Sequence, residues 1–298
     1  MPRPKPLPPG LSGRPFRVAD AAAAGISRAR LRASDLRAPF RGIRMPAGTA
    51  SMLDALRARM GPGEFVSHVT AARVYGIPLP ARLERSAELH VSVLAPAFAP
   101  RVRGVHGHRL SSPVVVGDYR GLPIVSAADA WCQLAGFLTE PELVVAGDHL
   151  VRRKRPQSSM QELAEALERH GSARGVRMLR SALRRVRPGT DSPMETRVRL
   201  LLVDAGLPEP VIGHTVLNSF GEFVATPDLC YPRERIAIEY EGELHRTDPA
   251  VFAEDIERRV LLERAGWAVI RVIKDHVYLR PNLLVNRVRT TLADRAVP

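Results

Sequence analysis

Cysteine is scarce in this chain, with two residues among 298. Cys132 and Cys230 lie far apart, and neither stands in a spacing that is typical of a metal site or a redox pair. A framework of several disulfides is therefore excluded. We interpret both cysteines as small apolar residues of the protein interior.

Long apolar runs are missing as well, because no stretch approaches the roughly 18 apolar residues that span a bilayer. The first residues, MPRPKPLPPGLSGRPF, are proline-rich and basic and lack the apolar segment of a signal peptide. We interpret residues 1–15 as a disordered tail. These features predict a cytoplasmic protein that does not act in a membrane.

Lysine is nearly absent, whereas arginine is abundant. Lys5, Lys154 and Lys274 are the three lysines among 44 basic residues, and the net charge is +13. This excess favours a polyanionic partner, because binding releases counterions from phosphates, and arginine suits bidentate contacts with phosphate and guanine. The codon bias of a GC-rich genome is the alternative explanation. We favour nucleic acid because the arginines also cluster along the chain.

The first arginine cluster lies in a segment with the pattern of a helix-turn-helix. A short helix is expected over residues 17–24, Gly25 ends it, and Ser27 is placed to cap a second helix up to about residue 34. The segment PFRGIRMPA predicts a strand in the position of a wing. Candidate DNA contacts on the second helix and the wing are Arg28, Arg30, Arg32, Arg41 and Arg44. An ordinary surface helix is the alternative.

Residues 51–80 have a helical pattern, and residues 88–125 contain several strand-like pieces. His106 and His108 alternate on one of these pieces, and two histidines on one strand face are able to bind a metal. No acidic residue lies beside them, so we expect surface histidines on a basic strand instead.

A change of composition at 152–158 predicts a hinge, and residues 156–189 are expected to form a helical linker. One of its helices, ARGVRMLRSALRRV, carries apolar residues on one face and arginines on another. Arg177, Arg180, Arg184 and Arg187 belong to this stripe. It is either an ordinary solvated face or a surface that follows the phosphates of DNA.

A last domain is expected over residues 190–298, after RPGTDSP. It begins with a helix and a hairpin, and RIAIEYE then reads as a strand, followed by a long helix, the apolar strand WAVIRVI and a final helix. Strand, helix and strand predict a right-handed crossover and a parallel pair. The domain is therefore α/β, with a mixed sheet flanked by helices.

Three carboxylates surround the most strand-like segment of this domain. Side chains alternate along RIAIEYE, so Glu239 and Glu241 share one face, and a hairpin at YPRE returns Asp228 toward Glu239. Like charges repel, and burial increases the cost, whereas Mg²⁺ or Mn²⁺ among the oxygens reverses the sign. We expect Asp228, Glu239 and Glu241 to bind a metal that promotes phosphodiester hydrolysis.

Nearby residues would complete this candidate site. His245 is placed to move a proton or bind phosphate, and Arg258 or Arg259 to contact the phosphate or a carboxylate. The alternatives are a loop histidine at 245 and two glutamates that face solvent at a sheet edge. Glu195 forms a capping box with Ser192, which explains it without catalysis.

The segments PDLCYPRERIAIEYEGELH and DIERRVLLERAGWAVIRV resemble very-short-patch-repair endonuclease-like domains of the PD-(D/E)xK superfamily. The resemblance implies a restriction-endonuclease-like fold with Asp228 and Glu239 as metal ligands. It places Glu241 and His245 in the active site and Glu195 as a supporting carboxylate.

Glu241 is a departure from that family, whose signature has lysine at this position. Lysine there would stabilise the attacking hydroxide, which glutamate cannot do. A second metal, His245 or Lys274 could substitute, or cleavage activity is lost.

The N-terminal half is similar to AbiEi-type antitoxins of type IV toxin–antitoxin systems. The similar segments, in order, are GISRARL, PFRGIRMPA, FVSHVTAARVYGIPLP, LHVSV and GLPIVSAADAWCQLA. The resemblance implies a winged helix-turn-helix over 16–60 and a small α/β domain over 61–155. A toxin partner or a homodimer would be the associated assembly.

We therefore expect a DNA-binding protein with a Mg²⁺-dependent endonuclease domain. The alternative is a transcriptional regulator or antitoxin-like protein whose nuclease-like domain is catalytically silent, which Glu241 favours. A third interpretation, an interaction protein that binds no nucleic acid, suits only the middle segment.

Overall fold

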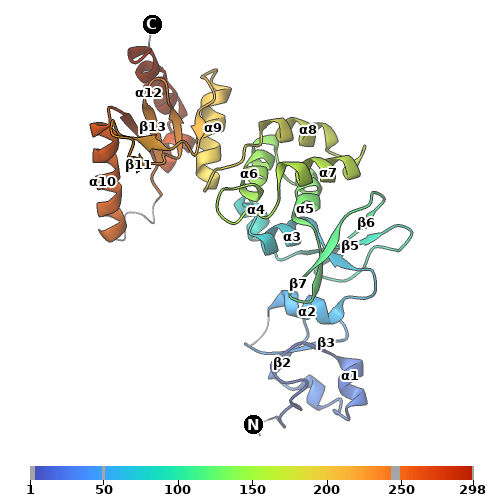
Figure 1. The fold of residues 1–298 in the computed structure, drawn as a ribbon. Helices are drawn as coiled ribbons and strands as arrows, with labels where there is room; N and C mark the ends of the chain where they lie inside the picture. The colour runs from blue at the N-terminus through green and yellow to red at the C-terminus, as the bar shows by residue number, and fades with distance from the viewer. Residues whose placement is uncertain (1–3, 49–50, 243–248, 297–298) are drawn as a thin grey trace. The chain divides into compact units, whose positions relative to one another are not determined.

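The computed structural model describes residues 4–48, 51–242 and 249–296, and shows a mixed α/β protein (Figure 1). Its contacts divide the chain into two compact units. Unit 1 comprises residues 1–136 and 165–176, and unit 2 comprises residues 137–164 and 177–298. Residue 190, where the sequence predicts a domain boundary, lies within unit 2.

Unit 1 begins with a small antiparallel sheet. Its elements are β1 (Phe16–Arg17), α1 (Val18–Ala23), β2 (Leu36–Arg37) and β3 (Ile43–Pro46), with strand order β1-β3-β2. Phe16, Ala21 and Leu31 form the core of this region. Leu7 and Leu11, which lie in the tail expected to be disordered, pack against that core. The predicted helix at 17–24 is confirmed by α1, and the strand predicted in PFRGIRMPA is confirmed by β3.

The prediction of a second helix after Ser27, as part of a helix-turn-helix, is wrong. The structure has one 3₁₀ turn, Arg30–Arg32, although the amide of Arg30 does donate to the Ser27 hydroxyl at 3.2 Å. The helix does not continue because the chain turns away into β2, which pairs with β3. Arg30 donates to both carboxylate oxygens of Asp35, at 2.9 and 2.7 Å, which fixes this turn.

A five-stranded mixed sheet forms the centre of unit 1, in the order β6-β5-β4-β8-β7. Its strands are β4 (Phe65–Val66), β5 (Leu89–Leu94), β6 (Val105–Leu110), β7 (Val116–Tyr119) and β8 (Leu122–Val125). The helices of this region are α2 (Met52–Arg59), α3 (His68–Tyr75), α4 (Ala81–Glu84) and α5 (Ala127–Gln133). Residues 51–80 are therefore not one helical stretch, because β4 pairs with β5 and β8 between α2 and α3.

Four histidines stack on one another beside strands β5 and β6. The ring centroids of His68 and His108 are 3.6 Å apart, and those of His106 and His108 are 4.6 Å apart. His90 Nδ1 and His108 Nε2 are 2.9 Å apart. His106 is exposed, as expected for a surface histidine, but His108 is half-buried and His90 is buried. The expectation of two surface histidines was therefore wrong for His108.

This histidine cluster is expected to make unit 1 sensitive to acid. Burial lowers the pKa of His90 and His108 to about 4 and of His68 to about 2, with smaller effects from neighbouring charges. Because these values lie below the unfolded pKa of about 6.5, the unfolded chain binds more protons. The stability of unit 1 should be complete above pH 6.5 and fall by roughly 3 kcal/mol by pH 4, after allowance for solvent screening.

Urea unfolding at several pH values would test this expectation, with Trp131 fluorescence as the probe of unit 1 in a Trp267→Phe background. His108→Gln should reduce the dependence on pH, whereas His214→Gln in unit 2 should not. Equal stability at pH 7 and pH 4 would contradict the prediction.

The middle segment contains three helices. They are α6 (Glu140–Leu150), α7 (Met160–His170) and α8 (Val176–Arg185). At the start of α7 the amide of Glu162 donates to the Ser159 hydroxyl at 3.1 Å, and the amide of Ser159 donates to the Glu162 carboxylate at 2.9 Å. This reciprocal pair is a capping box.

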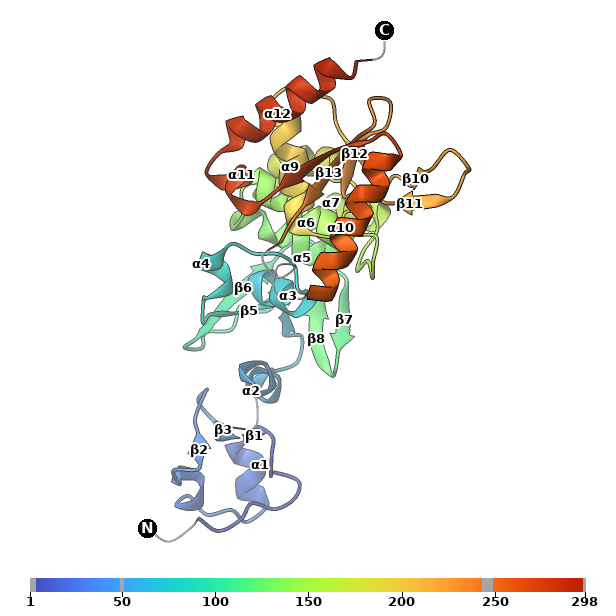
Figure 2. The same ribbon diagram turned by 90° about the vertical axis from the view of Figure 1, so that its left-hand side faces the viewer.

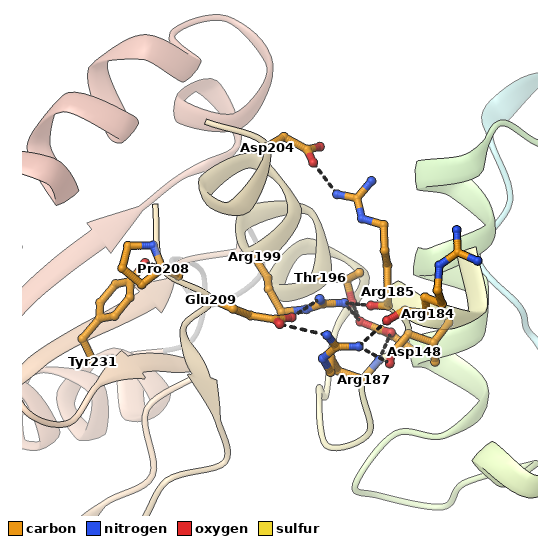
Figure 3. A network of polar contacts seen from close by, with 11 residues as sticks. Asp148, Arg184, Arg185, Arg187, Thr196, Arg199, Asp204, Pro208, Glu209 and Tyr231 are labelled. Atoms are coloured by element: carbon orange, nitrogen blue, oxygen red, sulfur yellow. Dashed lines mark hydrogen bonds and ion pairs between the residues drawn. The ribbon is translucent and has the colours of Figure 1, made fainter. Parts of the chain in front are cut away.

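A buried ion pair joins α6 to α9 (Pro193–Asp204) in unit 2. Arg199 and Thr196 point from α9 toward Asp148 of α6, and both donate to Asp148 Oδ2, at 2.8 and 2.9 Å (Figure 3). The second oxygen of Asp148 accepts from the amide of Arg187 at 2.7 Å. Glu209 accepts from Arg199 on the other side, at 2.8 Å. The network therefore compensates two buried charges and holds α9 against α6.

The sheet of unit 2 has the order β14-β13-β12-β9. Its strands are β9 (Val211–Ile212), β12 (Leu229–Tyr231), β13 (Ile236–Tyr240) and β14 (Ala268–Val272); β10 (Val216–Leu217) and β11 (Phe223–Ala225) form a separate hairpin. The helices that follow β13 are α10 (Pro249–Arg264), α11 (Lys274–Tyr278) and α12 (Pro281–Asp294). The pair β13 and β14 is parallel, as the sequence predicts.

The two faces of this sheet have different neighbours. Ile236 and Ile238 of β13 belong to one core with residues of α9 and α12. Ala237 points to the other face, in a core with Leu262 of α10. Figure 1 shows the strands between α10 and α9, and Figure 2 shows the β10–β11 hairpin beside α10. The alternation of side chains along β13 is therefore confirmed.

No helix of the described ranges combines the length and the apolar character that a membrane span needs. Cys132 and Cys230 are both buried and free, which confirms their interpretation as interior residues.

Candidate functional site

The hairpin of β12 and β13 brings Asp228 next to Glu239. Leu229 pairs with Ile238 and Cys230 with Ala237, so the register places Asp228 opposite Glu239. One oxygen of Asp228 accepts from the amide of Tyr240 at 2.8 Å. The predicted return of Asp228 toward the strand is therefore confirmed.

Glu239 lies on the α10 face of β13 and is 7% exposed. Its Oε2 accepts from Nη2 of Arg258 at 2.8 Å, so Arg258 contacts a carboxylate, one of the two roles expected of it. Arg259 instead forms a pair with Glu263, one turn further along α10, at 3.7 Å. The candidate site therefore contains one arginine of this helix.

Glu241 does not join Asp228 and Glu239. Its carboxylate is paired with both the Nε and the Nη2 groups of Arg271, from the neighbouring strand β14. Among the residues whose side chains the structure describes, no three His, Cys, Asp or Glu residues are placed to hold a metal ion. The predicted set of three converging ligands is therefore wrong, because a strand neighbour already neutralises Glu241.

Glu195 lies at the start of α9 and is 6% exposed. The Ser192 hydroxyl accepts from its amide at 3.2 Å, which is the predicted cap. Its carboxylate accepts from the amide of Asp191 at 2.8 Å. Burial, and then the charge of Asp228, raise the pKa of Glu195 to about 7. A buried carboxyl with such a pKa is able to hold or release a proton near neutral pH.

Asp228 has a similar environment. Burial raises its pKa, whereas the hydrogen bond from Tyr240 and the charge of Arg258 lower it. Asp191 contributes a further rise. The structure thus gathers carboxylates whose mutual repulsion and burial favour either protons or a cation between them.

The sequence did not indicate Asp191 and Arg153 as members of this site. Arg153 is paired with Asp191, and the charges of Glu195 and Asp228 raise its pKa further. Asp191 directly precedes the N-cap residue Ser192, and no sequence motif marks it as a catalytic residue. Only the packing of unit 2 places Arg153 there, from a point in the chain 38 residues earlier.

Mg²⁺ keeps several waters and binds through one or two carboxylates together with substrate phosphate, and the register of β12 and β13 offers two carboxylates. Asp228 and Glu239 are the residues that would hold it. His245, to which the sequence assigns a proton-transfer or phosphate-binding role, lies outside the described residues. Lys274 is exposed at the start of α11.

The arginines expected to contact DNA differ in their surroundings. Arg30 is paired with Asp35, and Arg44 donates to backbone oxygens of Leu31 and Ile43. The exposed members of the expected set are Arg28, Arg32 and Arg41 in unit 1 and Arg177, Arg180 and Arg184 on α8. In each unit, three arginines of the expected set are therefore accessible to a phosphate backbone.

Two other arginines at the end of α8 have structural partners. Arg185 is paired with Asp204, and Arg187 donates to Glu209 at 2.9 Å. The exposed stripe of α8 is therefore distinct from the arginines that fix the fold.

Comparison with known proteins finds two relatives. They are the uncharacterized proteins MT2308 and Rv2248 of Mycobacterium tuberculosis, from strains CDC 1551 and H37Rv. Each is 28% identical to this chain over 246 residues, which covers 82% of this chain and 86% of the relative. No family model matches.

Proposed function

We propose that this protein binds DNA and hydrolyses its phosphodiester bonds with Mg²⁺ or Mn²⁺ at Asp228 and Glu239. The observation that carries the proposal is the register of β12 and β13, which puts the two carboxylates side by side on the α10 face. A divalent ion there would neutralise the attacked phosphate and lower the pKa of a bound water. Glu195, with a pKa of about 7, is the residue to accept or supply the proton.

The order of elements in unit 2 supports a restriction-endonuclease-like domain. A helix with a buried Glu195 precedes a hairpin with Asp228 and Glu239, and a helix then leads to a parallel strand. In unit 1, α1, the 3₁₀ turn and the sheet β1-β3-β2 support a small winged module, although its second helix is a single turn.

Nicking of supercoiled plasmid by the purified protein tests the proposed activity. We expect conversion to the open circular form in Mg²⁺ or Mn²⁺, and none in excess chelator. Plasmid that stays supercoiled with either metal, over protein concentrations that bind it, would overturn the nuclease proposal.

A regulator or antitoxin-like protein with a silent nuclease-like domain is the second candidate function. The ion pair of Glu241 with Arg271 favours it, because Glu241 stands where the nuclease signature that the segment resembles has its lysine. Salt-sensitive, sequence-specific DNA binding without cleavage in any divalent metal would decide for it.

The exposed arginines of α8 are expected to contact phosphates. Arg177, Arg180 and Arg184 lie at i, i+3 and i+7, and therefore on one side of the helix. Each lost phosphate contact lowers the salt dependence of binding by about 0.9 in the slope of log K against log salt. Changing all three to Gln should lower the slope by about 2 to 3, measured by fluorescence anisotropy of a labelled duplex. Arg187→Gln is the control, and an equal slope in the triple variant would exclude this face.

A further inference from the structure

The ion pair between Glu239 and Arg258 joins a buried group to an exposed one. The Glu239 side chain is 9% exposed, whereas the Arg258 side chain is 43% exposed. The guanidinium therefore reaches from the surface of α10 to a carboxylate in the interior.

This pair lies where the proposed metal would bind. A buried carboxylate is costly unless a positive charge compensates it. Arg258 supplies that charge at 2.8 Å from Glu239 Oε2, and its charge also acts on Asp228. A divalent ion between the same two carboxylates would make the guanidinium unnecessary and would repel it.

We propose that Arg258 is a resident counter-ion of Glu239, which the divalent cation displaces and which then binds a phosphate of the substrate. This inference rests on the proposed function. The guanidinium is suited to both positions, because its fork of donors matches carboxylate and phosphate alike.

The proposal also accounts for the glutamate at position 241. The nuclease signature that this segment resembles has a lysine there, but in this chain Glu241 is held by Arg271 on the neighbouring strand. Arg258 approaches the carboxylates from α10 instead, and so brings a cationic group to the site from a different element. The positive charge near the phosphate thus comes from a helix rather than from β13.

Titration calorimetry with Mn²⁺ in the absence of DNA tests the displacement. Arg258→Gln should bind Mn²⁺ about five- to tenfold more tightly than the unchanged protein, because a competing charge worth about 1 kcal/mol is gone. Arg258→Lys keeps the charge, so its affinity for Mn²⁺ should stay close to that of the unchanged protein. This variant controls for a change in the fold caused by the substitution itself. Arg259→Gln is the matched control, since its partner is Glu263.

Plasmid nicking tests whether the displaced Arg258 binds a phosphate of the substrate. In plasmid nicking, Arg258→Gln should reach half-saturation at a lower Mg²⁺ concentration, while its maximal rate falls at least tenfold. An unchanged maximal rate would show that Arg258 does not contact the phosphate of the substrate.

The outcomes separate this inference from the proposed function. If Mn²⁺ binds with a dependence on Asp228, but Arg258→Gln binds it no more tightly, the displacement is wrong and the metal site stands. If neither the unchanged protein nor Arg258→Gln binds Mn²⁺, both are wrong.

Discussion

Asp228→Asn is expected to lower Mg²⁺-dependent nicking about a thousandfold, which corresponds to roughly 4 kcal/mol of transition-state stabilisation. Asparagine keeps an oxygen that can accept from the amide of Tyr240, so the hairpin of β12 and β13 should persist. What is lost is a negatively charged ligand of the cation, opposite Glu239 in the register. The measurement is the initial rate of nicking at saturating Mg²⁺.

Glu241→Gln is the matched control for this experiment. It removes a carboxylate from the same strand, but the structure pairs that carboxylate with Arg271 and keeps it away from Asp228. We expect its rate to stay within about threefold of the unchanged protein, a difference of well under 1 kcal/mol. Equal nicking by Asp228→Asn would indicate a contaminating nuclease or a different site, and loss of activity in Glu241→Gln alone would reverse the assignment of the ligands.

Arg199→Met is expected to destabilise unit 2 by about 3 to 5 kcal/mol. Arg199 is 1% exposed and Asp148 is fully buried, so the substitution leaves a carboxylate in the interior without its counter-charge. The donor to Glu209 is lost at the same time. The measurements are urea unfolding and hydrogen exchange of α9, which reports unit 2 separately from unit 1.

Arg187→Met is the control for this prediction. Arg187 also donates to Glu209, but its side chain is 39% exposed, and we expect a cost of less than about 1 kcal/mol. The double variant Asp148→Leu and Arg199→Met should recover part of the stability, because no unpaired charge stays buried. A loss of under 1 kcal/mol in Arg199→Met alone would show that the pair does not stabilise α9.

The local elements of this fold were largely predictable because their causes are local. Ser126, Ser159 and Ser192 precede helices, and each hydroxyl accepts from a backbone amide three residues later. Alternation along β13 similarly predicts which face carries Glu239. Such signals depend on residues that are close in the chain, so the sequence alone is enough to identify them.

The predictions that were wrong concern features whose causes are distant in the chain. The helix expected after Ser27 is cut short by the pairing of β2 with β3, and a strand interrupts residues 51–80 because it is paired with β5 and β8. His90 and His108 were not expected to lie together, since they come from different strands that only the parallel register of β5 and β6 aligns. In each case a partner distant in the chain decides the outcome.

The amino-acid sequence by itself determined the α/β class, the basic charge and the hairpin that returns Asp228 to Glu239, because composition, periodicity and turns act at short range. Tertiary structure alone decided which carboxylate belongs with which arginine. Arg271 forms an ion pair with Glu241, Arg258 with Glu239, and Arg153 with Asp191. These choices depend on distances of a few ångströms between segments remote in the chain, and only the pairing of strands and the packing of helices sets those distances.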